Sequence, residues 1–154
     1  MKKNACLFLF LTLLFLICGC VYRARTYEFD QPIENIEKVE IMTYDENTNT
    51  TSLLKELEKE EYTSLLNSIT KLSCWKYFGD GMRFSVGKSI IYITYIDGSA
   101  EAIGYNNNVH INSSGEWEID MYYFDDYEFY DLLSKYVDRD LLPSITFEES
   151  EMPQ

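Results

Sequence analysis

The sequence is poor in histidine, which occurs only once in 154 residues, as His110. A metal centre that uses a pair of histidines is therefore excluded. No serine stands in the glycine-flanked turn of a hydrolase nucleophile elbow either. The acid–base candidate that remains is His110 with Glu118 as its partner, and the alternative is an ordinary surface pair of an imidazole and a carboxylate.

The sequence also lacks a calcium loop. Four aspartates stand close together, at Asp120, Asp125, Asp126 and Asp131. They have neither the alternate spacing of oxygen ligands nor the glycine that such a loop requires. We therefore expect no metal site and no cofactor.

Basic residues are half as frequent as acidic ones, with 13 lysines and arginines against 26 aspartates and glutamates and a net charge of −13. A surface this acidic repels nucleic acid and anionic lipid head groups. The partners that remain are cations, basic proteins or peptides, and neutral sugars of a cell surface.

The apolar run near the N-terminus is too short for a typical membrane-spanning helix, which needs about 20 residues. It extends over 13 residues from Ala5 to Ile17 and follows Lys2 and Lys3. A positive end followed by about 7–15 apolar residues is typical of a secretory signal.

Ile17-Cys18-Gly19-Cys20 follows that run and resembles the lipobox of bacterial lipoprotein signals. The resemblance implies a signal peptide over residues 1–19, cleavage between Gly19 and Cys20, and a diacylglycerol group on the Cys20 thiol. Because two acyl chains hold a protein stably on a bilayer, we expect the domain on the extracytoplasmic face of the cell membrane. The alternative is an uncut signal anchor from Ala5 through Tyr22.

Cleavage would remove two lysines and no acidic residue, which changes the net charge from −13 to −15. It would also remove Cys6 and Cys18. With Cys20 lipidated, Cys74 stands alone and no internal disulfide can form. We expect Cys74 to be a buried small side chain rather than a nucleophile or an intermolecular bridge.

The remaining length suits one domain. We assign residues 20–32 to the lipidated cysteine and a tether. Residues 33–140 are assigned to a single α+β domain, and residues 141–154 to an acidic, flexible tail.

Alternating apolar and polar residues predict a strand over 38–44. Apolar residues at intervals of three and four, preceded by glutamates, predict a helix over about 58–71. Residues 51–55 are compatible with a return strand or with the start of that helix. Asp125 as a cap, with Glu128 three residues later, predicts the start of a last helix.

A first hairpin is predicted from Ser89–Ile96 and Ser99–Tyr105, joined by a two-residue turn at Asp97-Gly98. That register pairs Ile93 with Ala102 and Thr94 with Glu101. Glu101 then belongs to the more polar face of the hairpin, nearer water.

A second hairpin is predicted from Val109–Ile111 and Glu116–Tyr123, with a three-residue loop over 113–115. Its register sets His110 opposite Glu118. The order of elements predicts an α+β fold, with an antiparallel, meandering sheet and two helices packed on one face.

Aromatic residues are concentrated beside acids in the second hairpin. Alternation places Tyr122 and Phe124 on the face of Glu118 and Asp120, opposite Trp117. We predict that these five residues contribute to a partner-binding surface, because interfaces use rigid amphipathic rings. The alternative is that the rings fill the core between sheet and helix.

Several stretches together resemble small lipoproteins of unknown function from Gram-positive bacteria: the lipobox, Ile36–Ile41, Glu60-Glu61-Tyr62 and Ile93–Gly98. The resemblance implies a displayed module and supplies no reaction. Our leading hypothesis is a non-enzymatic binding module, such as an immunity or inhibitor lipoprotein that captures a basic protein or peptide. The alternatives are a cell-wall hydrolase that uses His110 and a structural subunit of a membrane complex.

Overall fold

The computed structural model describes residues 25–45, 48, 50–76, 89–105, 108–120 and 122–142. The predicted signal peptide, Cys20, and residues 143–154 of the predicted tail lie outside these residues. No helix in the described part of the chain is long and apolar enough to cross a membrane.

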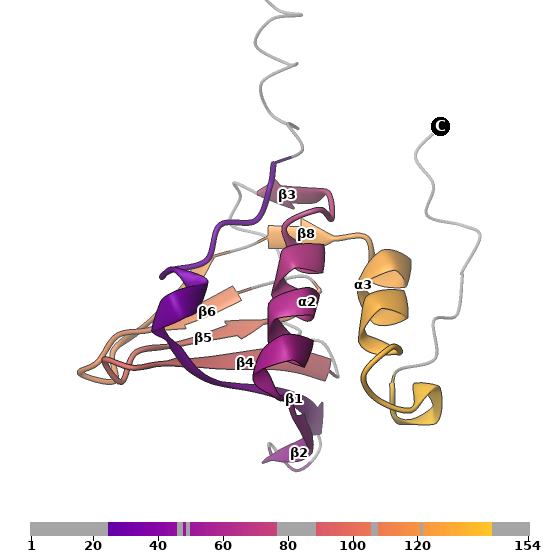
Figure 1. Ribbon diagram of the computed structural model, residues 1–154, viewed down its shortest axis with the longest axis horizontal. Helices are drawn as coiled ribbons and strands as arrows, with labels where there is room; N and C mark the ends of the chain where they lie inside the picture. Colours follow the sequence, from indigo (N-terminus) through magenta and orange to yellow (C-terminus); the bar gives the residue numbers. More distant parts are fainter. Residues whose placement is uncertain are drawn as a thin grey trace, which may run out of the picture.

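The fold is α+β, as predicted, and its main element is a six-stranded antiparallel sheet (Figure 1). The strand order is β2-β1-β4-β5-β6-β7, and β3 pairs with β8 in a second, two-stranded sheet. The strands are β1 Ile36–Asp45, β2 Thr50–Glu56, β3 Cys74–Lys76, β4 Ser89–Tyr95, β5 Ala100–Ile103, β6 Asn108–Ile111, β7 Trp117–Asp120 and β8 Tyr122–Phe124. Residues 51–55, left open by the sequence, therefore belong to a strand.

Two α-helices accompany the sheets, α2 at Lys59–Ile69 and α3 at Asp126–Leu133. Short 3₁₀ turns, η1 at Ile33–Asn35 and η2 at Arg139–Leu141, precede β1 and follow α3. The finer expectation, that both helices pack on one face of the sheet, stays a prediction.

The start of each helix is fixed by a carboxylate, because the first backbone N–H groups of a helix have no intrahelical acceptor. Glu61 accepts the backbone N–H of Glu58 at 3.1 Å, and Asp125 accepts that of Glu128 at 3.0 Å. The cap predicted at Asp125 and the helix predicted over about 58–71 are both confirmed.

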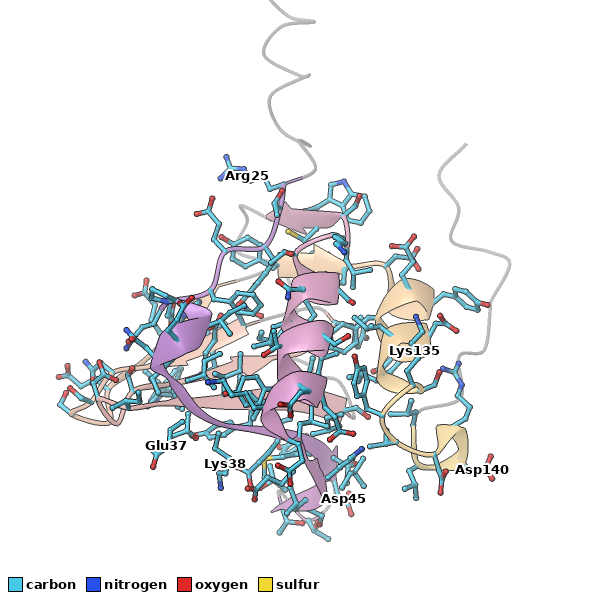
Figure 2. All side chains as sticks on the ribbon, in the orientation of Figure 1. Arg25, Glu37, Lys38, Asp45, Lys135 and Asp140 are labelled. Atoms are coloured by element: carbon cyan, nitrogen blue, oxygen red, sulfur yellow. The ribbon has the colours of Figure 1, made fainter. Side chains whose placement is uncertain are left out.

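The core is one cluster that contains the sheet and both helices. Alternate residues of β4, namely Ile91, Ile93 and Tyr95, are fully buried. They share this cluster with fully buried side chains of β1, α2 and α3, which are Val39, Ile41, Leu65, Leu66, Ile69, Phe129 and Leu133. Each buried aliphatic side chain stabilises the fold by about 1.5–3 kcal/mol. Charged residues such as Glu37, Lys38 and Asp140 lie at the periphery of the domain (Figure 2).

The predicted register of the first hairpin is wrong by one residue. Ile93 pairs with Glu101 and Thr94 with Ala100. Tyr95 donates its N–H to the carbonyl of Ser99 and accepts the N–H of Gly98, both at 2.9 Å. These bonds close a three-residue loop over 96–98, in which Gly98 has a φ of +84°. This is a three-residue loop with its glycine in the left-handed position, rather than the two-residue turn that Asp-Gly favours.

The register shift changes the position of Glu101. A shift of one residue moves every side chain of a strand to the opposite face. Glu101 therefore lies on the face of Ile91 and Ile93 and is fully buried, whereas the sequence placed it on the more polar face. This difference creates the site described below.

The second hairpin has the predicted register, with His110 opposite Glu118 and Val109 opposite Ile119. Gly115 has a φ of +84°, as its place in a three-residue loop requires. The single strand predicted to end at Tyr123 is wrong, however. Strand β7 ends at Asp120, and residues 122–124 pair with β3 in the other sheet.

The predicted tether and domain boundaries also need correction. The described domain includes Arg25, which exchanges backbone hydrogen bonds with Cys74 at 2.8 and 3.2 Å. Tyr27 belongs to the core and is 1% exposed. At the other end Leu142, 6% exposed, also packs in the core. The packed domain therefore includes residues 25–32 and extends past residue 140, because the core contains apolar side chains on both sides of the predicted limits.

Candidate functional site

The core-facing side of the sheet changes from apolar to polar between β4 and β7. Ile93, Glu101, His110 and Glu118 are direct cross-strand partners on four consecutive strands. Directly paired residues of an antiparallel sheet point to the same face. Glu101, His110 and Glu118 thus continue the face that carries Ile91, Ile93 and Tyr95 at β4.

Glu101 is the centre of a buried hydrogen-bond network. Its Oε1 accepts the hydroxyl of Tyr27, and its Oε2 accepts the hydroxyl of Tyr95 at 2.7 Å. The backbone N–H of Asp30 donates to the same Oε2 at 3.3 Å. These bonds fasten the segment before η1 to β5, because two of the three donors belong to residues 27–30.

Burial raises the pKa of the Glu101 carboxyl above its usual range, although the hydrogen bonds from Tyr27 and Tyr95 act in the opposite direction. Burial, followed by the nearby Glu101 carboxylate, also raises the pKa of both tyrosine hydroxyls. Both tyrosines therefore keep their protons at neutral pH and act as donors. The hydrogen bonds stabilise the Glu101 carboxylate at a buried position of β5 that an apolar side chain would ordinarily occupy.

No described lysine or arginine forms an ion pair with Glu101. His110, the cross-strand partner of Glu101, contacts Asp30, with its Nδ1 2.7 Å from Asp30 Oδ2. The other ring nitrogen, Nε2, is buried and has no hydrogen-bond partner among the described residues. Two residues earlier on the same face, Asn108 is fully buried, and neither atom of its amide has a described partner.

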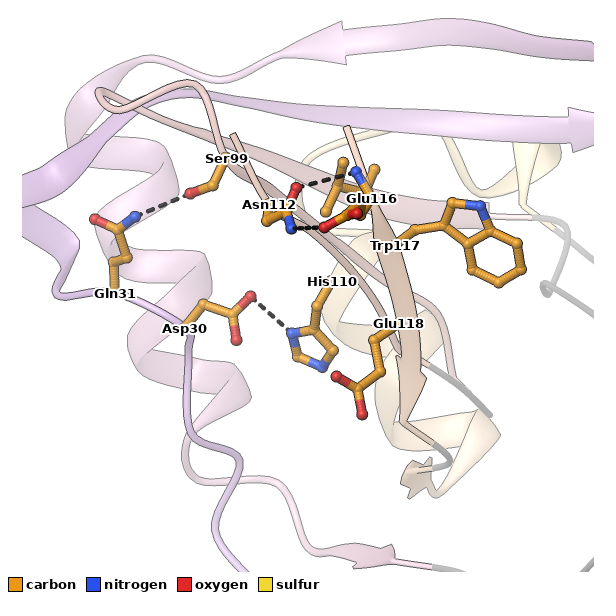
Figure 3. Close-up of a pocket in the computed structure, with 9 residues that line it drawn as sticks. Asp30, Gln31, Ser99, His110, Asn112, Glu116, Trp117 and Glu118 are labelled. Atoms are coloured by element: carbon orange, nitrogen blue, oxygen red, sulfur yellow. Dashed lines mark hydrogen bonds and ion pairs between the residues drawn. The ribbon is translucent and has the colours of Figure 1, made fainter. Parts of the chain in front are cut away.

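An open pocket of about 400 Å³ lies beside this network (Figure 3). Three carboxylates line it, those of Asp30, Glu116 and Glu118, together with His110 and Trp117. The Trp117 side chain is 68% exposed. No lysine or arginine is among the lining residues, so the pocket is acidic. Figure 3 shows the ring of Trp117 directed away from Asp30 and His110.

The pocket wall is held by hydrogen bonds between loops. Gln31 donates to Asp97 at 2.8 Å and to Ser99 at 2.9 Å, which ties the segment before η1 to the first hairpin loop. Asn112 donates to Glu116 at 3.0 Å within the second hairpin loop. The two loops and the N-terminal segment together fix the shape of the pocket.

The structure separates the five residues predicted to bind a partner. Trp117 and Glu118 line the pocket. Tyr122 is half-buried, with its ring centroid 5.6 Å from that of Tyr27, and Phe124 is 4% exposed. The side chain of Asp120 lies outside the described part of the chain. The prediction that Phe124 lies on an outward strip is wrong, because the chain changes sheets after Asp120 and the alternation is broken there.

Sequence reasoning missed Tyr27, Asp30 and Glu101. Asp30 and Tyr27 fell in the predicted tether, and no local pattern links them to Glu101, which lies more than 70 residues away. Glu101 could have been found from the sequence if the first loop had been given three residues. In that register a glutamate occupies a core-facing position. A charged residue there breaks the apolar pattern of the core, and such violations are expected at functional sites.

Cys74 is a free and fully buried thiol, as expected. Its Sγ donates to the carbonyl oxygen of Arg25 at 3.0 Å. Burial raises the pKa of this thiol. A buried thiol with a raised pKa is inert, so the structure gives no support to a nucleophilic role.

The hydrolase alternative needs a nucleophile next to His110. The one hydrogen bond of the His110 ring within the described residues joins it to Asp30. No described serine, threonine or cysteine is hydrogen-bonded to the imidazole, so the described residues contain no nucleophile–base pair at this site.

In the comparisons with known proteins, no protein-family model, no curated protein and no solved structure matches this chain. The resemblance to small Gram-positive lipoproteins stays a prediction.

Proposed function

We propose that this chain is a lipid-anchored, extracytoplasmic binding module, held by lipid on Cys20, that captures a basic protein or peptide. The observation that carries the proposal is the acidic pocket beside Trp117. Its three carboxylates line an open space without a lysine or arginine in its lining. The exposed ring of the neighbouring residue Trp117 points away from Asp30 and His110 (Figure 3).

A lysine or arginine side chain is complementary to this arrangement. Carboxylates of Asp30, Glu116 and Glu118 attract the cation, and the net charge of −13 adds a long-range attraction for a basic protein. A second cationic side chain of the partner, over the exposed face of Trp117, would gain about 0.5–2 kcal/mol more. Tryptophan is also enriched among the residues that dominate binding energies.

The proposed anchor would hold this pocket near the membrane. Asp30 lies ten residues after Cys20 in the sequence. An extended chain covers at most about 3.3–3.6 Å per residue, so Asp30 would lie within roughly 35 Å of the lipidated cysteine. A partner that approaches or inserts into the membrane would meet the pocket there.

The anchor is tested by intact mass and membrane partitioning of the expressed chain, wild type against Cys20→Ala. Loss of residues 1–19, a gain of lipid mass and partitioning with membrane are expected for the wild type alone. If both forms stay uncut and membrane-bound, the segment from Ala5 to Tyr22 is a signal anchor and the lipid proposal is wrong.

The partner is tested by titrating the protein with a lysine- and arginine-rich peptide in the presence of EDTA. Trp117→Ala should weaken binding about 2- to 30-fold, the range that a cation–π contact contributes. Glu116→Gln should also weaken binding, and high salt should reduce the affinity further.

Matched controls are Tyr127→Ala, another exposed aromatic residue at 53%, and Glu128→Gln, an exposed acid on α3. Both should retain wild-type affinity in low salt. The proposal is wrong if the peptide does not bind, or if the controls lose as much affinity as the pocket variants. Binding that is independent of salt and specific to a neutral sugar would identify a different ligand class.

A further inference from the structure

We propose that Asp30, Glu101 and His110 form a binding site for a first-row divalent transition-metal ion of the Zn²⁺ type. One ligand atom from each residue lies within 4.8 Å of the others. The three residues come from three separate segments, the chain before η1, strand β5 and strand β6, and the fold brings them together.

The donor set fits such an ion. An imidazole nitrogen and two carboxylate oxygens are ordinary zinc ligands, at about 2.0–2.2 Å from the metal. Calcium by contrast prefers six to eight oxygen ligands without nitrogen. Two ligands about 2.0–2.2 Å from one tetrahedral metal lie roughly 3.3–3.6 Å apart. His110 Nδ1 and Asp30 Oδ2, now 2.7 Å apart, would therefore separate by less than about 1 Å on binding a metal. A proton bridges these two atoms now, and a metal would replace it.

The second ring nitrogen of His110 supplies an independent observation. When a metal binds Nδ1, the imidazole carries its proton on Nε2, which then needs an acceptor, usually a carboxylate. Nε2 is buried and has no described partner, and Glu118 stands directly opposite His110 on β7. Figure 3 shows the His110 ring between the side chains of Asp30 and Glu118. Glu118 is placed to act as this outer acceptor.

Charge favours a cation at this point. Glu101 is fully buried, and no described lysine or arginine pairs with it. A buried carboxylate without a cationic partner is unfavourable unless it is neutralised or coordinates a metal. Asp30 and Glu118 add two further acids beside one histidine. The pocket leaves the remaining coordination positions open to water or to a ligand.

This inference is independent of the proposed capture of a basic partner. The peptide titration above is carried out in EDTA with variants at Trp117 and Glu116. The metal titration below contains no partner and uses variants at Asp30 and His110. Failure of one therefore leaves the other standing.

The test is equilibrium dialysis of the full chain in detergent against Zn²⁺, with Co²⁺ as a spectroscopic probe of the same site. We expect one metal per chain. Substitution of a ligand, as in His110→Ala or Asp30→Asn, should weaken binding by more than the roughly 10–100-fold that loss of an outer-shell partner produces. Glu118→Gln should fall within that 10–100-fold range.

Asp30→Asn preserves the size of the side chain, which is 37% exposed, so this variant should remain folded. It therefore tests metal binding even if another variant unfolds. Glu60→Gln, an exposed acid on α2, is the matched control and should bind as the wild type does.

Three outcomes overturn the proposal. The first is that the wild type binds no stoichiometric Zn²⁺. The second is that His110→Ala and Asp30→Asn bind as the wild type does. The third is a thiolate-to-Co²⁺ charge-transfer band, which would place the metal on cysteine. In any of these cases the hydrogen bonds from Tyr27, Tyr95 and Asp30 to Glu101 have a structural role alone.

Discussion

The two ends of one sheet face differ in what they contribute. At β1 and β4 the core-facing side chains are mainly aliphatic, such as Val39, Ile41, Ile91 and Ile93, and they pack in the same cluster as α2 and α3. At β5, β6 and β7 the same face carries Glu101, His110 and Glu118. The first end supplies stability by apolar burial. The second end has polar groups in places where apolar ones would stabilise more, which is the pattern expected of a functional site.

The polar end is nevertheless held firmly. Burying a carboxylate without partners is strongly unfavourable, and Glu101 avoids this through two tyrosine hydroxyls and a backbone N–H. The donors Tyr27 and Asp30 come from the N-terminal segment, so this segment takes the place at the polar end that a helix occupies in an ordinary α+β core. The comparison predicts that the two ends respond differently to substitution.

The largest effect is expected at the apolar end. Leu65 on α2 is fully buried, and Leu65→Ala should lower the free energy of unfolding by about 2–5 kcal/mol, through lost burial and a new cavity. Urea denaturation measures this change. Affinity for Zn²⁺ or for the basic peptide should be unchanged under conditions in which the variant is folded. A loss of either affinity in the folded variant would show that the two ends are not separable.

A smaller effect is expected at the polar end. Tyr27→Phe removes one donor to buried Glu101 and should lower the free energy of unfolding by about 1–3 kcal/mol. Hydrogen exchange distinguishes the responses of the polar and apolar ends of the sheet. Tyr27→Phe should selectively reduce the protection of the amides of Arg25 and Asp30, which are held by this segment's contacts. Leu65→Ala should reduce protection across the whole domain. If Tyr27→Phe reduces amide protection equally across the whole domain, the N-terminal segment is not stabilised separately by its contacts with Glu101.

Local signals in the sequence predicted the local features of this fold. The cap at Asp125, the helix that begins after Glu58 and the second hairpin with His110 opposite Glu118 depend on residues a few positions apart. Periodicity and turn chemistry determine such features. The α+β class follows from their order, and the structure confirms it.

The site could be predicted only in part, because it depends on long-range contacts and on one loop. His110, Trp117 and Glu118 were identified from the second hairpin. Tyr27 and Asp30 contact Glu101 across more than 70 residues, and nothing in the sequence marks that contact. Glu101 itself was assigned to the wrong face, because Asp97-Gly98 is compatible with a two-residue and a three-residue loop. Loop length alone decides which face of β5 is buried.

The smallest expected effect tests that loop directly. Gly98 and Gly115 both have a φ of +84°, and a Cβ added at either would have no atom within 4 Å. Gly98→Ala and Gly115→Ala should therefore each lower the free energy of unfolding by about 1–2 kcal/mol, from backbone conformation alone. Their effects on the site should differ. Gly98 belongs to the loop that sets the register of Glu101, whereas Gly115 sets the register of β7 against β6.

Urea denaturation and hydrogen exchange of the Asp30 amide distinguish the two glycine variants. Gly98→Ala strains the loop that holds Glu101 on the core face, so the bond from Asp30 N–H to Glu101 should open more often. When the two variants are compared at the same free energy of unfolding, Gly115→Ala should leave the Asp30 amide protected. If both variants change Asp30 exchange equally, the register of Glu101 is fixed by its tyrosine partners rather than by the loop. The N-terminal segment would then determine the position of Glu101, and the conformation of the loop would be a consequence of that position.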